Sequence, residues 1–145
     1  MARLLYLEAS PRKERSASTG VAKAFVEEYR KTHPGDVIDT LDLWGTTLPE
    51  FDGEVIDAKY AILHGQPHAS GKKAAVVYAR GGAYPAGSGG EAFDLQKRYM
   101  EQFLGFIGFT GITPIVVEPT LGKPESVERT KAEAAARARS AVGAF

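Results

Sequence analysis

Hydrophobic and polar positions along the chain predict strands that alternate with helices. Leu4 to Leu7 form a continuous apolar run, which is typical of a strand buried on both faces. From Ser18 to Tyr29 apolar residues recur at helical spacing with charged residues between them, and residues 33–35 (His-Pro-Gly) end this pattern. Residues 37–43 then give a second strand-like segment with partial alternation.

The second half of the chain repeats this order. Residues 73–79 predict another buried strand, and 112–117 a further one. Between them, residues 93–107 predict an amphipathic helix, whose expected inward side chains are Leu95, Tyr99, Met100, Phe103, Leu104 and Ile107. Residues 124–142 predict an alanine-rich helix with Pro124 in its first turn, and 54–63 a short helix. The alternation favours an α/β fold with a mainly parallel sheet covered on both faces.

Composition narrows the class of protein. A chain of 145 residues with 43% hydrophobic and 25% charged residues predicts one globular domain spanning residues 1–145. Cysteine is absent, which excludes disulfides and thiolate chemistry. Eighteen basic and eighteen acidic residues cancel, which argues against a general nucleic-acid binder. The apolar runs are strand-sized and no signal peptide follows Met1, so we expect a cytoplasmic protein without a membrane segment.

The loop after the first predicted strand is the first candidate site, because ligands of open parallel sheets bind beyond the carboxyl ends of strands. Ser10, Ser16 and Ser18 lie on it with Arg12 and Arg15, directly before a helix. Hydroxyls, free backbone N–H groups and the helix dipole favour an anion such as a phosphate there. The loop lacks the GxGxxG and GxxxxGK[ST] spacings of common nucleotide sites. Alternatively, Ser16 or Ser18 only caps the helix.

The second candidate is the loop that follows the strand at 73–79. Arg80, Gly81 and Gly82 open a glycine-rich stretch that reaches Gly90. Two adjacent glycines allow the backbone to approach a flat ligand closely, although a simple turn explains them equally well.

Other chemistry has weaker support in the sequence. The three histidines show no metal-ligand spacing, and no GxSxG motif indicates a serine hydrolase. Trp44 and Phe51 are predicted to be packing residues. The aromatic residues Phe103, Phe106 and Phe109 are predicted to lie in the core or in a dimer contact.

Three stretches of this chain resemble the FMN-dependent NADH azoreductase and NAD(P)H quinone reductase family. They are the opening strand with the Ser10 loop and Ser16-Ala17-Ser18, the segment from 71–74 into 79–82, and residues 103–108. The resemblance implies a flavodoxin-like three-layer fold with FMN as cofactor. It also implies hydride transfer from NADH or NADPH, quinone or azo substrates, and a homodimer.

The resemblance assigns binding residues but no catalytic side chain and no metal. It implies that the first loop holds the FMN phosphate and that the second lies against the isoalloxazine ring. The residues that match are Ser10, Ser16, Ala17 and Ser18 for the phosphate, and Ala79, Arg80, Gly81 and Gly82 for the ring.

One strand-helix unit of that family has no counterpart between His68 and Gly71. In a sheet ordered 2-1-3-4-5 this unit carries the central strand. Three outcomes stay open: the strand at 73–79 moves beside the first strand to give 2-1-4-5, another chain fills the gap, or the sequence omits residues. The expected function is therefore an FMN-dependent oxidoreductase with impaired activity. The alternative is a non-catalytic domain that binds a phosphate-bearing ligand or a partner, and a serine hydrolase ranks last.

Overall fold

The computed structural model describes residues 1–48, 50, 52–54, 56–57, 60, 64 and 72–145. Its main elements are β1 (Arg3–Glu8), α1 (Ala17–Thr32), β2 (Val37–Asp42), β3 (Lys73–Ala79), α3 (Leu95–Phe106), β4 (Gly111–Val117) and α4 (Pro124–Ala141). Short 3-10 turns cover Lys13–Arg15, Glu91–Phe93 and Val142–Ala144. The four predicted strands and the three long helices are confirmed. Of the short helix predicted at 54–63, the described residues are helical and the others lie outside the described part.

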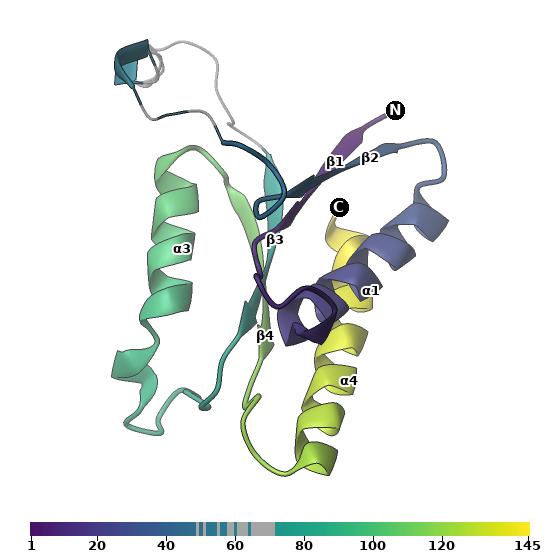
Figure 1. Cartoon of the computed structure of the whole chain (residues 1–145), viewed down its shortest axis with the longest axis vertical. Helices are drawn as coiled ribbons and strands as arrows, with labels where there is room; N and C mark the ends of the chain where they lie inside the picture. The colour runs from purple at the N-terminus through teal and green to yellow at the C-terminus, as the bar shows by residue number, and fades with distance from the viewer. Residues whose placement is uncertain (49, 51, 55, 58–59, 61–63, 65–71) are drawn as a thin grey trace.

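The strands form two separate parallel pairs. In the first pair Arg3 of β1 lies opposite Val37 of β2, and in the second Lys73 of β3 lies opposite Gly111 of β4. Within the described residues β1 and β3 do not pair, so the shift to the order 2-1-4-5, one of the three outcomes left open by the sequence, does not occur. The two pairs diverge toward the top of Figure 1. Each pair therefore keeps one edge turned toward the other pair.

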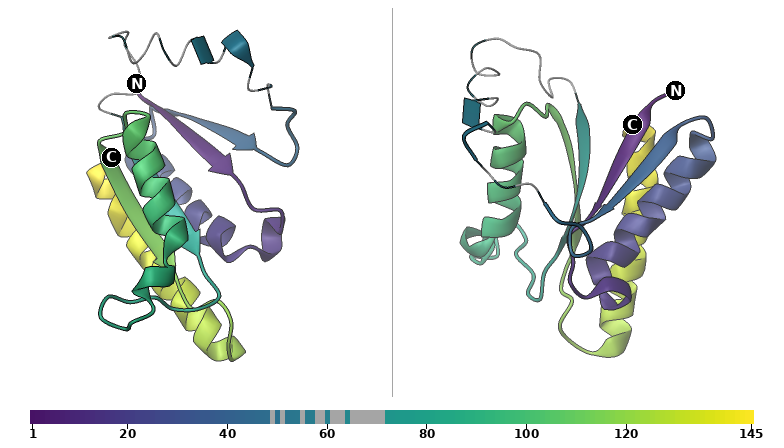
Figure 2. Two further views of the ribbon diagram at one scale, coloured as in Figure 1. Left: turned by 90° about the vertical axis from the view of Figure 1, so that its left-hand side faces the viewer. Right: turned by 45° about the horizontal axis from the view of Figure 1, so that its top comes forward.

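The helices complete three layers around these strands. α1 and α4 lie side by side on one side, and α3 lies on the other side of β3 and β4 (Figures 1 and 2). Strand–helix alternation and all-parallel pairing put helices on both faces of the strands. The predicted flavodoxin-like α/β fold with a missing central unit is thus confirmed.

The hydrophobic core lies between the helix layer of α1 and α4 and the strands. Its buried residues are Val21, Phe25, Tyr29, Ile115, Val117, Ala134, Ala138 and Val142. Ala134 and Ala138 have no exposed surface, so α4 approaches α1 closely. Leu4 of β1 and Val77 of β3 both pack against this cluster. One shared core therefore holds the two strand pairs together without hydrogen bonds between β1 and β3.

α3 differs from its prediction because none of its residues is buried. Leu95 and Tyr99 are each 66% exposed and Phe103 is 44% exposed, so their predicted inward orientation is wrong. Met100 and Leu104 line the space between the strand pairs instead. The side chains of Leu95 and Tyr99 are thus largely uncovered among the described residues.

Candidate functional site

The loop between β1 and α1 presents hydroxyl and amide groups at the start of a sixteen-residue helix. Ser16 is the N-cap of α1, since its Oγ accepts a hydrogen bond of 3.2 Å from the Thr19 N–H. The Ser18 Oγ lies 3.0 Å from the Ser16 Oγ. Helix geometry leaves the N–H groups of Ala17 and Ser18 without an intrahelical acceptor. Capping therefore explains Ser16, whereas the cap does not require the Ser18 hydroxyl.

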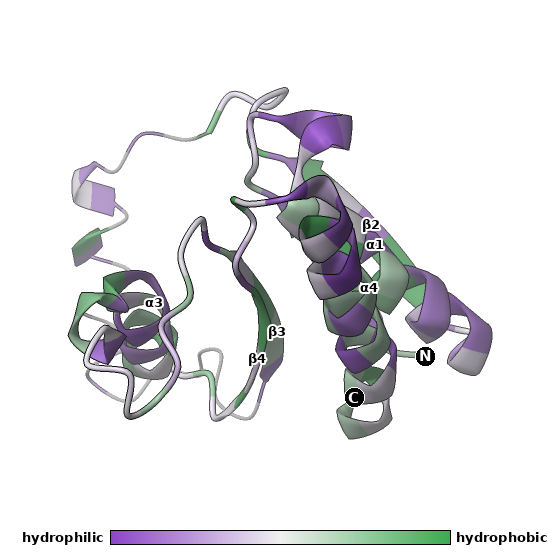
Figure 3. Cartoon of the chain, turned by 90° about the horizontal axis from the view of Figure 1, so that it is seen from below, coloured by the Kyte–Doolittle hydropathy of each residue, from purple (hydrophilic) through white to green (hydrophobic). Residues whose placement is uncertain are grey.

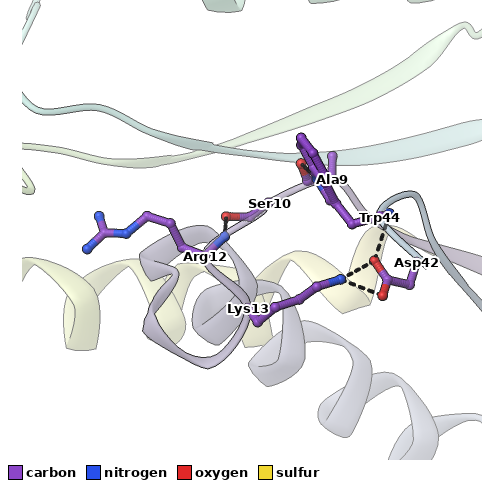
Figure 4. Close-up of polar contacts among 6 residues, drawn as sticks. All are labelled: Ala9, Ser10, Arg12, Lys13, Asp42 and Trp44. Carbon is purple, nitrogen blue, oxygen red and sulfur yellow. Dashed lines mark hydrogen bonds and ion pairs between the residues drawn. The ribbon is translucent and has the colours of Figure 1, made fainter.

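Side chains from the end of β2 fix the position of this loop (Figure 4). The Lys13 ammonium forms an ion pair with the Asp42 carboxylate, and the Trp44 N–H donates to Asp42 Oδ1 at 3.0 Å. The hydrogen bond from Lys13 and then that from Trp44 hold the pKa of Asp42 below its usual value. The Trp44 indole N–H also donates to the Ala9 carbonyl at 3.0 Å. Lys13 adopts a left-handed φ of 49°, which the tight turn of the loop requires.

Two sequence predictions change in this loop. Trp44 was expected to be a packing residue, but its side chain is 62% exposed and its indole N–H donates to the Ala9 carbonyl. Phe51 lies outside the described residues. The Ser10 hydroxyl accepts a weak hydrogen bond of 3.4 Å from the Arg12 N–H, which shapes the turn locally.

Arg80 lies buried directly after the last residue of β3. Its guanidinium forms an ion pair with Glu118 at 3.0 Å and another with Asp94, and it lies over the Tyr84 ring at 5.4 Å. The Arg80 N–H donates to the Val117 carbonyl at 3.0 Å, and its carbonyl accepts from the Thr120 N–H at 2.8 Å. The guanidinium thus joins β3, α3 and β4, and only the loop backbone remains for a flat ligand.

Burial and nearby charges shift the pKa values of Asp94 and Tyr78, which lie near Arg80. Desolvation alone would raise the pKa of Asp94, but hydrogen bonds from Arg80 and the Lys97 N–H hold it below its usual value. Burial also raises the pKa of Tyr78, which lies two residues before Arg80 on β3, to about 12. Both groups therefore keep one protonation state across the neutral range.

Sequence reasoning missed Asp42, Asp94 and Glu118. Two of them carry a usable signal, because Asp42 ends β2 and Glu118 follows the last residue of β4. A carboxylate at the end of a parallel strand lies at the edge where ligand loops gather. Asp94 gives a different signal, since it is the N-cap of α3 and accepts from the Lys97 N–H at 3.3 Å.

A cavity of about 940 Å³ separates β1 from β3. Side chains of β1, α1, β3 and α3 line it, and it extends to Ala9 and Ser18 of the first loop. The Ala79–Gly82 loop leaves β3 at the same end at which the Ser10 loop leaves β1. The two predicted parts of the site therefore share one end of the fold but have an unfilled strand position between them. The described residues contain no cluster of side chains suited to a metal ion.

Comparison with known protein families and solved structures also identifies a flavodoxin-like fold. A family described by its flavodoxin-like fold matches residues 2–70 and 57–142 of this chain. Among solved structures, an azoreductase from Bacillus anthracis str. Sterne superimposes with a TM-score of 0.81 at 20% identity and full coverage of both chains. An FMN-dependent NADH-azoreductase from Bacillus anthracis str. Ames Ancestor, in complex with FMN, gives 0.75 at 16% identity, covering 99% and 98% of the chains. At these identities the likeness shows the fold.

Relatives with higher sequence identity show the family to which the chain belongs. The FMN-dependent NADH:quinone oxidoreductase of Nitratidesulfovibrio vulgaris (strain DP4) is 36% identical over 203 aligned positions, covering 96% of this chain and 97% of the relative. That of Desulfotalea psychrophila is 35% identical over 198 positions, covering 92% and 93%. Since 203 positions face a chain of 145 residues, at least 58 positions of the first relative have no counterpart here. With fold, loop geometry and sequence in agreement, the chain belongs to the flavodoxin-like family of FMN-dependent NADH:quinone oxidoreductases.

Proposed function

We propose that this chain is an FMN-dependent oxidoreductase that reduces quinones or azo compounds with NADH or NADPH. Relatives at 36% and 35% identity carry the name FMN-dependent NADH:quinone oxidoreductase, and the similar solved structures are azoreductases. Bound FMN supplies the chemistry by accepting a hydride from the nicotinamide and passing electrons to the substrate. The residues of this chain bind and orient the cofactor.

The observation that carries the proposal is the hydroxyl pair at the start of α1. The Ser18 Oγ and the amides of Ala17 and Ser18 offer three donors to a phosphate, and the dipole of α1 favours its negative charge. Ser16 positions this turn as its N-cap. Ser10 shapes the loop ahead of it.

The second loop would contact the ring through its backbone. Arg80 is a positioning residue in this proposal, because its guanidinium is engaged with Asp94 and Glu118. Ala79, Gly81 and Gly82 would lie against the flavin plane, where small or absent side chains allow close approach.

Replacing Ser18 by alanine tests the phosphate site. Loss of one hydrogen bond to a charged group, worth about 1.5–3 kcal/mol, should weaken FMN binding roughly ten- to a hundredfold. The free energy of unfolding should stay unchanged, since Ser18 is not the helix cap. A fluorescence titration with FMN and a thermal melt on the same sample measure both quantities.

Two further variants distinguish an effect on FMN binding from an effect on the N-cap of α1. Ser140→Ala, at an exposed position of α4, is the matched control and should change neither quantity. Ser16→Ala should weaken FMN binding and also lower stability by about 1 kcal/mol through loss of the cap. If Ser18→Ala binds FMN as well as the unaltered chain does, the serines only cap the helix and the phosphate assignment fails.

A non-catalytic flavodoxin-like domain is the second candidate, and the unfilled position between β1 and β3 favours it. Flavin chemistry needs a ring that is fixed and shielded from water, and the cavity leaves one side of that site open. NADH oxidation by the FMN-loaded protein with a quinone acceptor distinguishes the two candidates. Saturable FMN binding without turnover would favour the non-catalytic domain.

We also propose that the chain is a single domain that forms a homodimer through α3. Leu95, Tyr99, Phe103 and Phe106 recur at helical spacing and are 44–66% exposed. Tyr99 and Phe103 stack with ring centroids 6.2 Å apart, and Figure 3 shows hydrophobic positions along α3. Exposed apolar patches of this kind mark interaction surfaces on folded proteins.

Tyr99→Lys should convert the dimer to a monomer, because a charge would be buried at the centre of the contact. Light scattering after size exclusion measures the mass. Leu121→Lys, 76% exposed and outside α3, is the control and should leave the dimer intact. A monomeric unaltered chain would contradict this assembly.

The nicotinamide donor supports a cytoplasmic location, which we include in the proposal. No helix among the described residues is both long and apolar enough to cross a bilayer.

A further inference from the structure

The facing edges of β1 and β3 present backbone groups that no strand pairs within the described residues. The Ala2 carbonyl accepts from the Val37 N–H of β2, and the Glu8 carbonyl accepts from the Leu43 N–H directly after β2. The even-numbered residues of β1 therefore turn their backbone groups toward β2. The groups of Arg3, Leu5 and Leu7 therefore point toward β3. This edge offers three donors and three acceptors to a further strand.

The same reasoning applies to β3. The Arg80 N–H donates to Val117 of β4, so the even-numbered residues of β3 face β4. Backbone groups of Lys73, Ala75, Val77 and Ala79 consequently point toward β1. The strands run in the same general direction, from the top of Figure 1 downward. The two edges are therefore matched in hydrogen-bonding pattern and direction.

The space between these edges is apolar. Its 940 Å³ are lined by side chains such as Leu5, Leu7 and Phe25, with Met100 and Leu104 from α3. Leu5 and Leu7 are 57% and 51% exposed, although they belong to a continuous apolar strand. A strand buried on both faces in a parallel sheet is itself nearly continuously hydrophobic.

The relatives indicate which polypeptide fits this space. The two family matches meet in the overlap 57–70, which lies between β2 and β3 in chain order. The N. vulgaris relative has at least 58 positions that no residue of this chain matches. A segment inserted between β2 and β3 can place a strand between β1 and β3 through a right-handed crossover.

We propose that the space between β1 and β3 is a docking site for a separate polypeptide, which adds one apolar strand parallel to both edges. Main-chain hydrogen bonds to seven edge residues would supply affinity, as in other cases of strand addition. Apolar side chains on both faces of the added strand would cover Leu5 and Leu7 on one side and contact α1 on the other. The partner is therefore chemically equivalent to the strand-helix unit that the relatives carry in their own chains.

The probe is the segment of the N. vulgaris relative without counterpart here, fused to a soluble carrier and added to the full 145-residue chain. Calorimetry should show saturable one-to-one binding. Residue-resolved hydrogen exchange should slow at least about tenfold at Leu5, Leu7, Ala75 and Val77, whose amides face the space. Exchange at the even-numbered neighbours, which are already paired, should change less.

Leu5→Pro removes one donor from the β1 edge and should abolish docking. Since that amide has no ladder partner, the variant should retain its fold. Leu5→Val keeps the N–H and should bind the probe like the unaltered chain. Absence of binding, or binding without slowed exchange at the four edge amides, would overturn the proposal even if Leu5→Pro failed to fold. Slow exchange at those amides in a dimer without the probe would also overturn it, because a second copy would then fill the space.

Discussion

Replacing Arg80 by methionine should lower the free energy of unfolding by about 3–5 kcal/mol, the usual effect of removing one partner from a buried ion pair. The Arg80 side chain is 7% exposed, and its partners Asp94 and Glu118 are 17% and 18% exposed. Methionine fills a similar volume but leaves two carboxylates in a desolvated position. Denaturant unfolding followed by circular dichroism measures the loss. Arg98→Met, on the exposed surface of α3, is the matched control and should change stability little.

The pH dependence of the same variant checks the cause. Because Asp94 has a depressed pKa in the folded chain, its stabilisation is present above its unfolded pKa and is lost as pH falls through the folded value. The difference in stability between the unaltered chain and Arg80→Met should therefore narrow below about pH 4. A constant difference down to pH 2 would show that packing, and not the ion pair, is the source.

Ile115→Ala should destabilise the fold by about 2–5 kcal/mol, because it removes buried methylene groups and leaves a cavity. Ile115 is 2% exposed and belongs to the core cluster between β4 and the helices α1 and α4. Both strand pairs pack on this cluster through Leu4 and Val77. The loss should therefore appear in one cooperative transition, measured by thermal melting at two wavelengths.

Ile107→Ala provides the control for the core prediction. The same atoms are deleted at a residue that is 36% exposed and lies outside the core cluster, so the melting temperature should fall less than in Ile115→Ala. Two separate transitions in Ile115→Ala would contradict a shared core. They would mean that the β1–β2 and β3–β4 halves unfold independently.

The pattern of apolar, capping and turn residues was sufficient to predict most strands and helices of this chain. The apolar runs at β1, β3 and β4 predicted strands correctly, but β1 is not covered on both faces as expected, since Leu5 and Leu7 are 57% and 51% exposed. The end of α1 followed from residues 33–35, since proline and glycine cannot continue a helix there. The Ser16 cap was also readable, because a serine before an amphipathic run commonly accepts the first free amides.

The candidate site was only partly predictable. The first loop was located correctly at the carboxyl end of a strand, and Ser16 and Ser18 lie within hydrogen-bonding distance of each other. Its attachment to β2 through Lys13 and Asp42 joins residues 29 positions apart, and the sequence holds no periodic signal for such a contact. Arg80 was expected beside a flavin ring, and the sequence did not indicate the ion pairs that its guanidinium forms with Asp94 and Glu118.

The sequence by itself determined the strand–helix order, the cap of α1 at Ser16, the resemblance to FMN-dependent reductases and the expected position of the absent unit. Only the tertiary structure decided how the four strands pair when that unit is absent. The core between α1, α4 and the strands holds β1 and β3 in their separate pairs, and no strand of the described part of the chain pairs with their facing edges. Tertiary structure alone decided this because side-chain packing on shared helices is non-local, whereas periodicity and capping depend on residues a few positions apart.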